Sequence, residues 1–65
     1  MADESAGREV FFEMTAVGGA VRVSAIDGAT GIEVIVMGPL TTPRSDLQRL
    51  ALRKLERRLA QEGGG

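Results

Sequence analysis

The hydrophobic pattern of this chain changes its period once, between residues 38 and 43, and that change constrains the fold more than any other feature. Over residues 9–37 the apolar residues tend to alternate with polar ones, and β-branched and aromatic types are enriched, which is typical of half-buried strands. Over residues 43–61 the apolar residues recur at helical spacing. We therefore expect a sheet first and a single helix last.

Two glycine-containing turns divide the first part into three predicted strands, at residues 9–16, 20–26 and 32–37. Gly18-Gly19 indicates a two-residue hairpin turn in which both central residues have positive φ. In the second turn, Asp27 is placed to accept a backbone hydrogen bond, and Gly31 to adopt a left-handed conformation. Because both connections are short, the strands are expected to be antiparallel and in the order 1-2-3.

The two turns also set the register, and the apolar pattern tests it, because a slip of one residue turns every side chain to the other face. The first hairpin places Phe12 opposite Ala25, and the loop 28–31 places Val34 opposite Ala25. One face is then almost wholly apolar: Val10, Phe12, Met14, Ala16, Val21, Val23, Ala25, Ile32, Val34 and Val36. The second face carries Glu9, Phe11, Glu13, Thr15, Arg22, Ser24, Ile26, Glu33, Ile35 and Met37.

The predicted helix has an apolar stripe suited to cover the apolar sheet face, namely Leu47, Ala51, Leu55 and Leu59 with Leu52 beside them. It begins either with Thr42 as cap and Pro43 in the first position, or with Ser45 in a capping box with Gln48. The sequence therefore predicts one α+β domain of order β-β-β-α over residues 9–61. This is a three-stranded antiparallel meander with the C-terminal helix packed on one face. Residues 1–8 and 62–65 are expected to be flexible tails.

The chemistry open to this domain is narrow, because its 65 residues include no His, Cys, Trp, Tyr or Asn. This excludes metal ligation by His or Cys, a thiol nucleophile and a Ser-His-Asp triad. Glu9 and Glu13 could form a carboxylate pair, but a two-layer domain of this size has little room for a substrate pocket. We expect no enzymatic activity, no cofactor, no metal and no small-molecule substrate.

Localisation is predicted from the apolar runs and from the N-terminal residues. Residues 1–9 are acidic and polar, whereas a secretory signal has a basic start and an apolar stretch. No apolar run approaches the roughly 18 residues of a membrane-spanning helix. We therefore expect a cytoplasmic protein that does not associate with membranes.

An apolar patch on the second sheet face is the first candidate for a functional surface. In the predicted register Phe11 lies across from Ile26, Ile35 is diagonal to Ile26, and Met37 lies opposite Arg22. Small domains bury a low fraction of their surface, and contiguous exposed apolar surface marks association sites. We therefore expect a non-catalytic protein–protein interaction module that forms a homodimer, or binds a protein partner, through Phe11, Ile26, Ile35 and Met37.

The helix is the second candidate surface because it is basic. Residues 44–62 hold six basic and three acidic side chains, a net charge of +3, whereas residues 1–43 carry a net charge of −4. Such a face can bind phosphates, although without an aromatic stacking residue it is also typical of a merely solvated helix face. The alternative function is therefore a nucleic-acid-binding accessory protein that uses Arg49, Arg53, Arg57 and Arg58.

Four runs of sequence carry a resemblance to a known family: Glu9-Val-Phe-Phe-Glu13, Val21-Arg-Val-Ser-Ala-Ile-Asp27, Thr30-Gly-Ile-Glu-Val34 and Leu50-Ala-Leu-Arg-Lys-Leu55. They resemble a family of short bacterial proteins known only as a domain of unknown function, over about residues 8–60. That family assigns no catalytic or binding residue. In the order of its elements the chain is also similar to the double-stranded-RNA-binding domain, in which a three-stranded antiparallel sheet precedes a basic helix. It lacks that domain's first helix, and Arg44-Ser45-Asp46 replaces the lysine-rich helix start.

Overall fold

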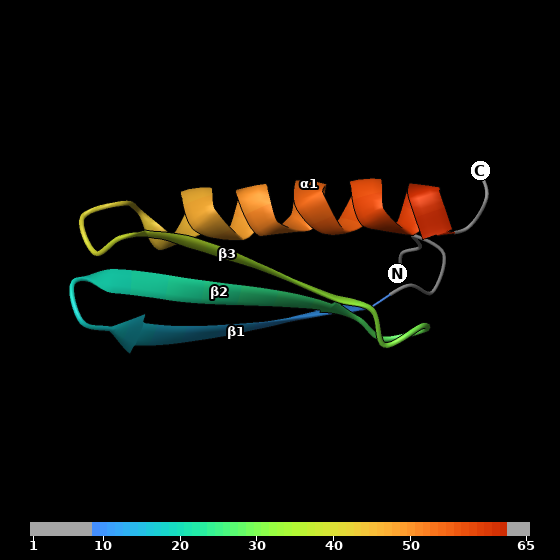
Figure 1. Ribbon diagram of the computed structural model, residues 1–65, viewed down its shortest axis with the longest axis horizontal. Coiled ribbons are helices and arrows are strands. Elements are labelled where there is room, and N and C mark those ends of the chain that lie inside the picture. The colour runs from blue at the N-terminus through green and yellow to red at the C-terminus, as the bar shows by residue number, and fades with distance from the viewer. Residues whose placement is uncertain (1–8, 63–65) are drawn as a thin grey trace.

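The computed structural model describes residues 9–62 as one antiparallel sheet with a helix on one face (Figure 1). The strands are β1 (Val10–Val17), β2 (Ala20–Asp27) and β3 (Glu33–Pro39), in the order β1-β2-β3, and the helix is α1 (Arg44–Glu62). This confirms the predicted β-β-β-α fold. Glu62 belongs to α1 rather than to a C-terminal tail. The predicted tail at residues 1–8, like residues 63–65, lies outside the described residues.

The register of both hairpins is the predicted one, with Phe12 opposite Ala25 and Ala25 opposite Val34. The first turn differs from the prediction in its backbone conformation. Gly18 has a φ of 59°, but Gly19 is not in the positive-φ region. One positive φ at the first central position is the pattern of a type II′ turn, and both primed types close a two-residue hairpin. The register is therefore unaffected.

The second turn is held by the side chain of Asp27, as predicted. This carboxylate is buried at the end of β2, and its Oδ2 accepts hydrogen bonds from the Thr30 amide at 2.9 Å and the Thr30 hydroxyl at 2.7 Å. Gly31 has a φ of 79°, in the left-handed region that glycine tolerates. The Gly31 amide donates to the Asp27 carbonyl at 2.8 Å, which closes the turn.

The hydrophobic core lies between α1 and strands β2 and β3. Its buried members are Val21, Val23, Ala25, Val34, Leu47, Ala51 and Leu55. Leu59, predicted as a member of the stripe, and Leu52, predicted beside it, are half-buried. At the N-terminal end of α1, Leu47 packs on Gly38, where an added Cβ would lie 2.7 Å from Leu47 Cδ2. The glycine at the end of β3 thus lets the helix approach the sheet closely.

The helix covers less of the apolar sheet face than predicted. It packs on β2 and β3, and β1 is the edge strand that lies farthest from it (Figure 1). Met14 is 37% exposed, Ala16 is exposed and Phe12 is half-buried. The physical reason is width: a helix about 10 Å across spans roughly two strands spaced about 4.8 Å apart. The β1 side of this face is therefore left partly open.

The helix begins at Arg44, and neither predicted cap describes its start. The carbonyl of Pro43 accepts hydrogen bonds from the amides of Asp46, at 3.0 Å, and Leu47, at 3.3 Å. Ser45 therefore lies inside the first turn, so the Ser45 capping box is wrong. The Thr42 alternative places the start one residue too early. No helix within residues 9–62 combines the length and the apolar character needed to cross a membrane.

Candidate functional site: two interaction surfaces

The outer face of the sheet, which we define as the face turned away from α1, carries all four residues predicted for self-association. Phe11 lies opposite Ile26, Ile35 opposite Ser24, and Met37 opposite Arg22. Phe11 is 52% exposed and Met37 is 55% exposed, whereas Ile35 is 36% exposed and Ile26 is half-buried. The structure thus brings the four together on one accessible surface.

Phe11 owes its position to the turn beside it. A Cβ added to Gly28 would lie 3.0 Å from Phe11 Cε2, so the aromatic ring occupies the space that a side chain at Gly28 would take. The Gly28 amide donates to the Glu9 carbonyl at 2.8 Å, which continues the β1–β2 ladder past Val10. The ring is therefore supported at the end of the sheet while half of its surface faces solvent.

Sequence reasoning missed Val17 as a member of this surface. Val17 is six residues after Phe11 on β1, so the two side chains point to the same face of the sheet. It lies opposite Ala20 and is 51% exposed. The alternation of side chains along a strand was the signal that could have found it. Val17 extends the exposed apolar surface to the opposite end of β1, next to the first turn.

The helix arginines, in contrast, do not form one cluster. Arg53 and Arg57 line an open groove of about 560 Å³ between α1 and β3, which we call the basic groove: Val36, Leu50, Arg53, Lys54 and Arg57. Arg49 lies on the other side of α1, at a smaller groove of about 300 Å³ that we call the β1 groove: Phe12, Ser45, Gln48, Arg49 and Leu52. The predicted set of four arginines is therefore divided.

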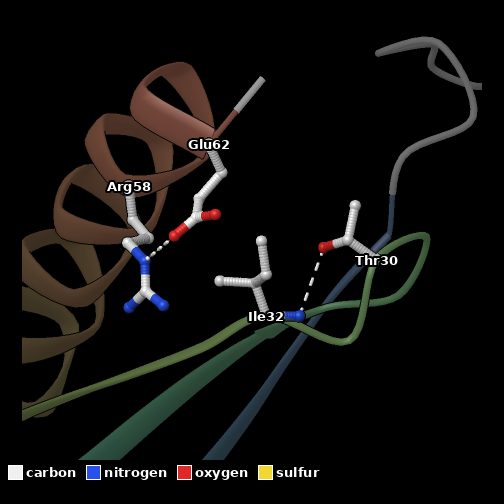
Figure 2. Close-up of polar contacts among 4 residues, drawn as sticks. All are labelled: Thr30, Ile32, Arg58 and Glu62. Atoms are coloured by element: carbon white, nitrogen blue, oxygen red, sulfur yellow. Dashed lines mark hydrogen bonds and ion pairs between the residues drawn. The ribbon is translucent and has the colours of Figure 1, made fainter. Parts of the chain in front are cut away.

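Two of the four arginines also have acidic neighbours on the helix. Arg58 Nε donates to Glu62 Oε2 at 2.9 Å (Figure 2), and Arg49 Nη1 lies 3.7 Å from Asp46 Oδ1. Both pairs are exposed, and exposed pairs contribute at most about 1 kcal/mol to stability. They lower the net positive charge at these two positions. Among the predicted arginines, Arg53 and Arg57 are thus the ones left to present positive charge.

Lys54 was not among the predicted site residues, although it lines the basic groove. Its ammonium donates to the backbone carbonyl of Ile35 at 2.9 Å, which ties α1 to the exposed edge of β3. Within the described part of the chain, no three His, Cys, Asp or Glu side chains lie close enough together to hold a metal ion.

Comparisons with known proteins place the chain in a family without assigning it an activity. No curated protein and no solved structure matches it. A family model described as a domain of unknown function (DUF6898) matches residues 7–62, which include all three strands and the helix. This agrees with the resemblance carried by the four sequence runs. The chain therefore belongs to the DUF6898 family, a domain of unknown function.

Proposed function

We propose that this domain is a non-catalytic protein–protein interaction module that self-associates through the outer face of its sheet. The observation that carries the proposal is the exposed apolar surface formed there by Phe11, Val17, Ile35 and Met37. Within residues 9–62 the helix lies on the opposite face, so nothing in this part of the chain covers these side chains. Exposed apolar side chains gathered on one face are characteristic of association sites.

Arg22 on β2 gives a second copy of the chain one point of charge complementarity on this face. It shares the face with three carboxylates, those of Glu9 and Glu13 along β1 and of Glu33 on β3. In a twofold dimer each surface meets itself, so Arg22 of one copy can approach a carboxylate of the other. Opposite charges placed in this way steer association and fix the orientation of two sheets that pack face to face.

The size of the face sets the expected strength of the dimer. Three neighbouring strands of seven or eight residues cover about 26 Å by 14 Å at the usual rise and strand spacing. This is smaller than the roughly 800 Å² that each partner buries in a typical stable interface. We therefore expect a concentration-dependent dimer, which has to be measured over a wide range of protein concentration.

Replacing Met37 with Asp is expected to weaken association through the outer face, raising the dissociation constant of that contact at least tenfold. Met37 is 55% exposed, so a carboxylate there is hydrated in the monomer but loses its water in a face-to-face dimer. Phe11→Asp, on the opposite edge strand, should have the same effect. Sedimentation equilibrium gives the dissociation constants, and urea unfolding checks that monomer stability is unchanged.

Leu50→Asp is the matched control for this experiment, because Leu50 is an exposed apolar residue on α1, away from the outer face. This variant should dimerise as the unsubstituted chain does. A chain that stays monomeric up to millimolar concentration would overturn the proposal, as would a Met37→Asp variant that dimerises unchanged.

The basic groove supports a second candidate function, the binding of nucleic acid. Arg53, Lys54 and Arg57 line it, and no carboxylate is among its lining residues. The three cations can contact consecutive phosphates along one side of α1, which is the sequence-independent part of nucleic-acid binding. Of the four arginines predicted to bind nucleic acid, Arg53 and Arg57 line this groove, and Lys54 joins them as a third cation.

If this second function holds, the logarithm of the affinity for duplex DNA should fall linearly with the logarithm of salt concentration. Three phosphate contacts predict a slope of roughly −2.7, and the Arg53→Gln, Arg57→Gln double variant should reduce it to about −0.9. Fluorescence anisotropy with labelled duplex DNA and RNA measures both slopes. Arg49→Gln is the control, because Arg49 lies on the other side of α1 beside Asp46. Absence of binding to either duplex at about 50 mM salt would rule this function out.

A further inference from the structure

The two edges of the sheet are not protected alike, because within residues 9–62 the β3 edge is blocked at two positions. The amide of Leu40 donates to the carbonyl of Gly19 at 3.1 Å, so even-numbered residues of β3 face β2 and odd-numbered ones face the edge. At that edge the Lys54 ammonium donates a hydrogen bond to the Ile35 carbonyl. Pro39 has no N–H to offer, and its carbonyl accepts from the Thr42 amide at 2.9 Å. Lysine and proline are common means of blocking an edge strand.

The β1 edge lacks both of these devices. The bond from the Gly28 amide to the Glu9 carbonyl sets the alternation here, so odd-numbered residues of β1 face β2. The even-numbered residues turn their amides and carbonyls outward: Val10, Phe12, Met14 and Ala16. The strand is eight residues long and contains no Pro, Lys or Gly. Within residues 9–62 no side chain covers this edge in the way that Lys54 covers Ile35.

The apolar sheet face is also left uncovered by α1 alongside this edge. Because α1 packs on β2 and β3, Met14 is 37% exposed, and Phe12 forms part of the β1 groove together with Leu52. A strand added to the β1 edge would extend the apolar face and place further side chains next to Phe12 and Met14. Open hydrogen-bonding groups and open apolar surface thus occur together along β1.

The sequence of β1 favours one antiparallel register with a second copy of itself. With the twofold axis at Met14, Phe12 lies opposite Ala16 of the second copy, which pairs a large side chain with a small one. The same axis sets Phe11 opposite Val17 and Glu13 opposite Thr15, and it uses the strand from end to end. An axis at Glu13 would instead place two carboxylates directly opposite each other, which destabilises a strand pair.

We propose that β1 pairs edge to edge with β1 of a second copy in the Met14 register, joining two three-stranded sheets into one six-stranded sheet. The outward groups of Phe12, Met14 and Ala16 then form about six backbone hydrogen bonds between the copies. Both helices lie on the same face of the joined sheet, and Phe12 and Met14 of the two copies line the strip between them. This interface forms along the edge of β1, and it does not depend on two outer faces packing against each other.

N-methylation of the Met14 amide tests the pairing, since a chain of 65 residues is accessible to chemical synthesis. The methyl group removes one outward donor and blocks the edge, while every side chain and every β1–β2 hydrogen bond is kept. The matched control carries the methyl group on the amide of Ile35, which faces the β3 edge. Both methyl groups are introduced into the Met37→Asp variant, in which outer-face association is weakened. Sedimentation velocity should show a dimer that is at least tenfold weaker with N-methyl-Met14 and unchanged with N-methyl-Ile35.

Hydrogen–deuterium exchange gives a second readout that does not require a modified backbone. The amides of Phe12, Met14 and Ala16 should become protected as the concentration of the Met37→Asp variant rises, whereas the Ile35 amide should exchange at one rate throughout. Three amides that exchange freely at every concentration would overturn the proposal. Equal weakening of the dimer by the two methyl groups would also overturn it. If Met37→Asp leaves dimerisation unchanged but N-methyl-Met14 abolishes it, the edge proposal holds and the outer-face proposal fails.

Discussion

Replacing Leu55 with Ala is expected to destabilise the domain by about 3 kcal/mol, within the range for buried leucines. Leu55 is fully buried at the centre of the helix stripe, and it packs in the cluster that joins α1 to β2 and β3. The loss of stability has two parts. One is the hydrophobic transfer free energy of the three carbon atoms removed, and the other is the cost of the cavity left between helix and sheet. A single core in a domain of this size rarely supplies more than about 3–5 kcal/mol, so much of the variant should be unfolded at 25 °C.

Urea unfolding followed by circular dichroism measures this loss, and Leu50→Ala is its matched control. Leu50 is on the same helix and undergoes the same chemical change, but it is 44% exposed. Its loss should remain below about 1 kcal/mol, because alanine has the higher helix propensity and little buried area is removed. If both variants lose equal stability, α1 does not pack on the sheet through Leu55.

The strand register was predictable because two independent signals agreed. The turns at Gly18 and Asp27 set the pairing, and the alternation around Phe12 and Val23 gave an apolar face in that pairing and no other. The backbone conformation at Gly19 was not predictable in the same way. Two consecutive glycines are compatible with either primed turn, so the sequence fixes the length of the loop but not its φ values.

The placement of the helix across the sheet was not predictable from local pattern. The stripe of Leu47, Ala51 and Leu55 shows which side of α1 faces inward, but not which two of the three strands it covers. That choice depends on tertiary packing, including the close contact between Gly38 and Leu47. It decides that β1 is left open and that Lys54 reaches the β3 edge.

The same packing explains the outcome for the predicted arginines. Successive positions four residues apart rotate by about 40° around a helix, so a run such as Arg49, Arg53 and Arg57 turns gradually from one side to the other. Once α1 lies on β2 and β3, Arg49 faces the β1 groove and Arg57 faces the basic groove. A count of charges along the helix predicts a basic element, but not a single basic surface.

Replacing Ala51 with Leu is expected to destabilise the domain by about 2 kcal/mol. Ala51 has no exposed surface, and it lies between Leu47 and Leu55 where α1 meets the sheet. Three additional carbon atoms have no free volume there, so α1 must move away from β2 and β3 or neighbouring side chains must leave their preferred rotamers. This variant overfills the interface that Leu55→Ala empties, and the two together test whether that interface is closely packed.

Ala60→Leu is the control, because Ala60 is exposed on the same helix and leucine ranks next below alanine in helix propensity. Its stability in urea should lie within about 0.5 kcal/mol of the unsubstituted chain. A stable Ala51→Leu variant would mean that the helix is free to shift across the sheet. The apolar surface beside β1 is open because α1 packs on β2 and β3. Hydrogen exchange at the Phe12, Met14 and Ala16 amides of that variant would then show whether a second copy still protects the β1 edge.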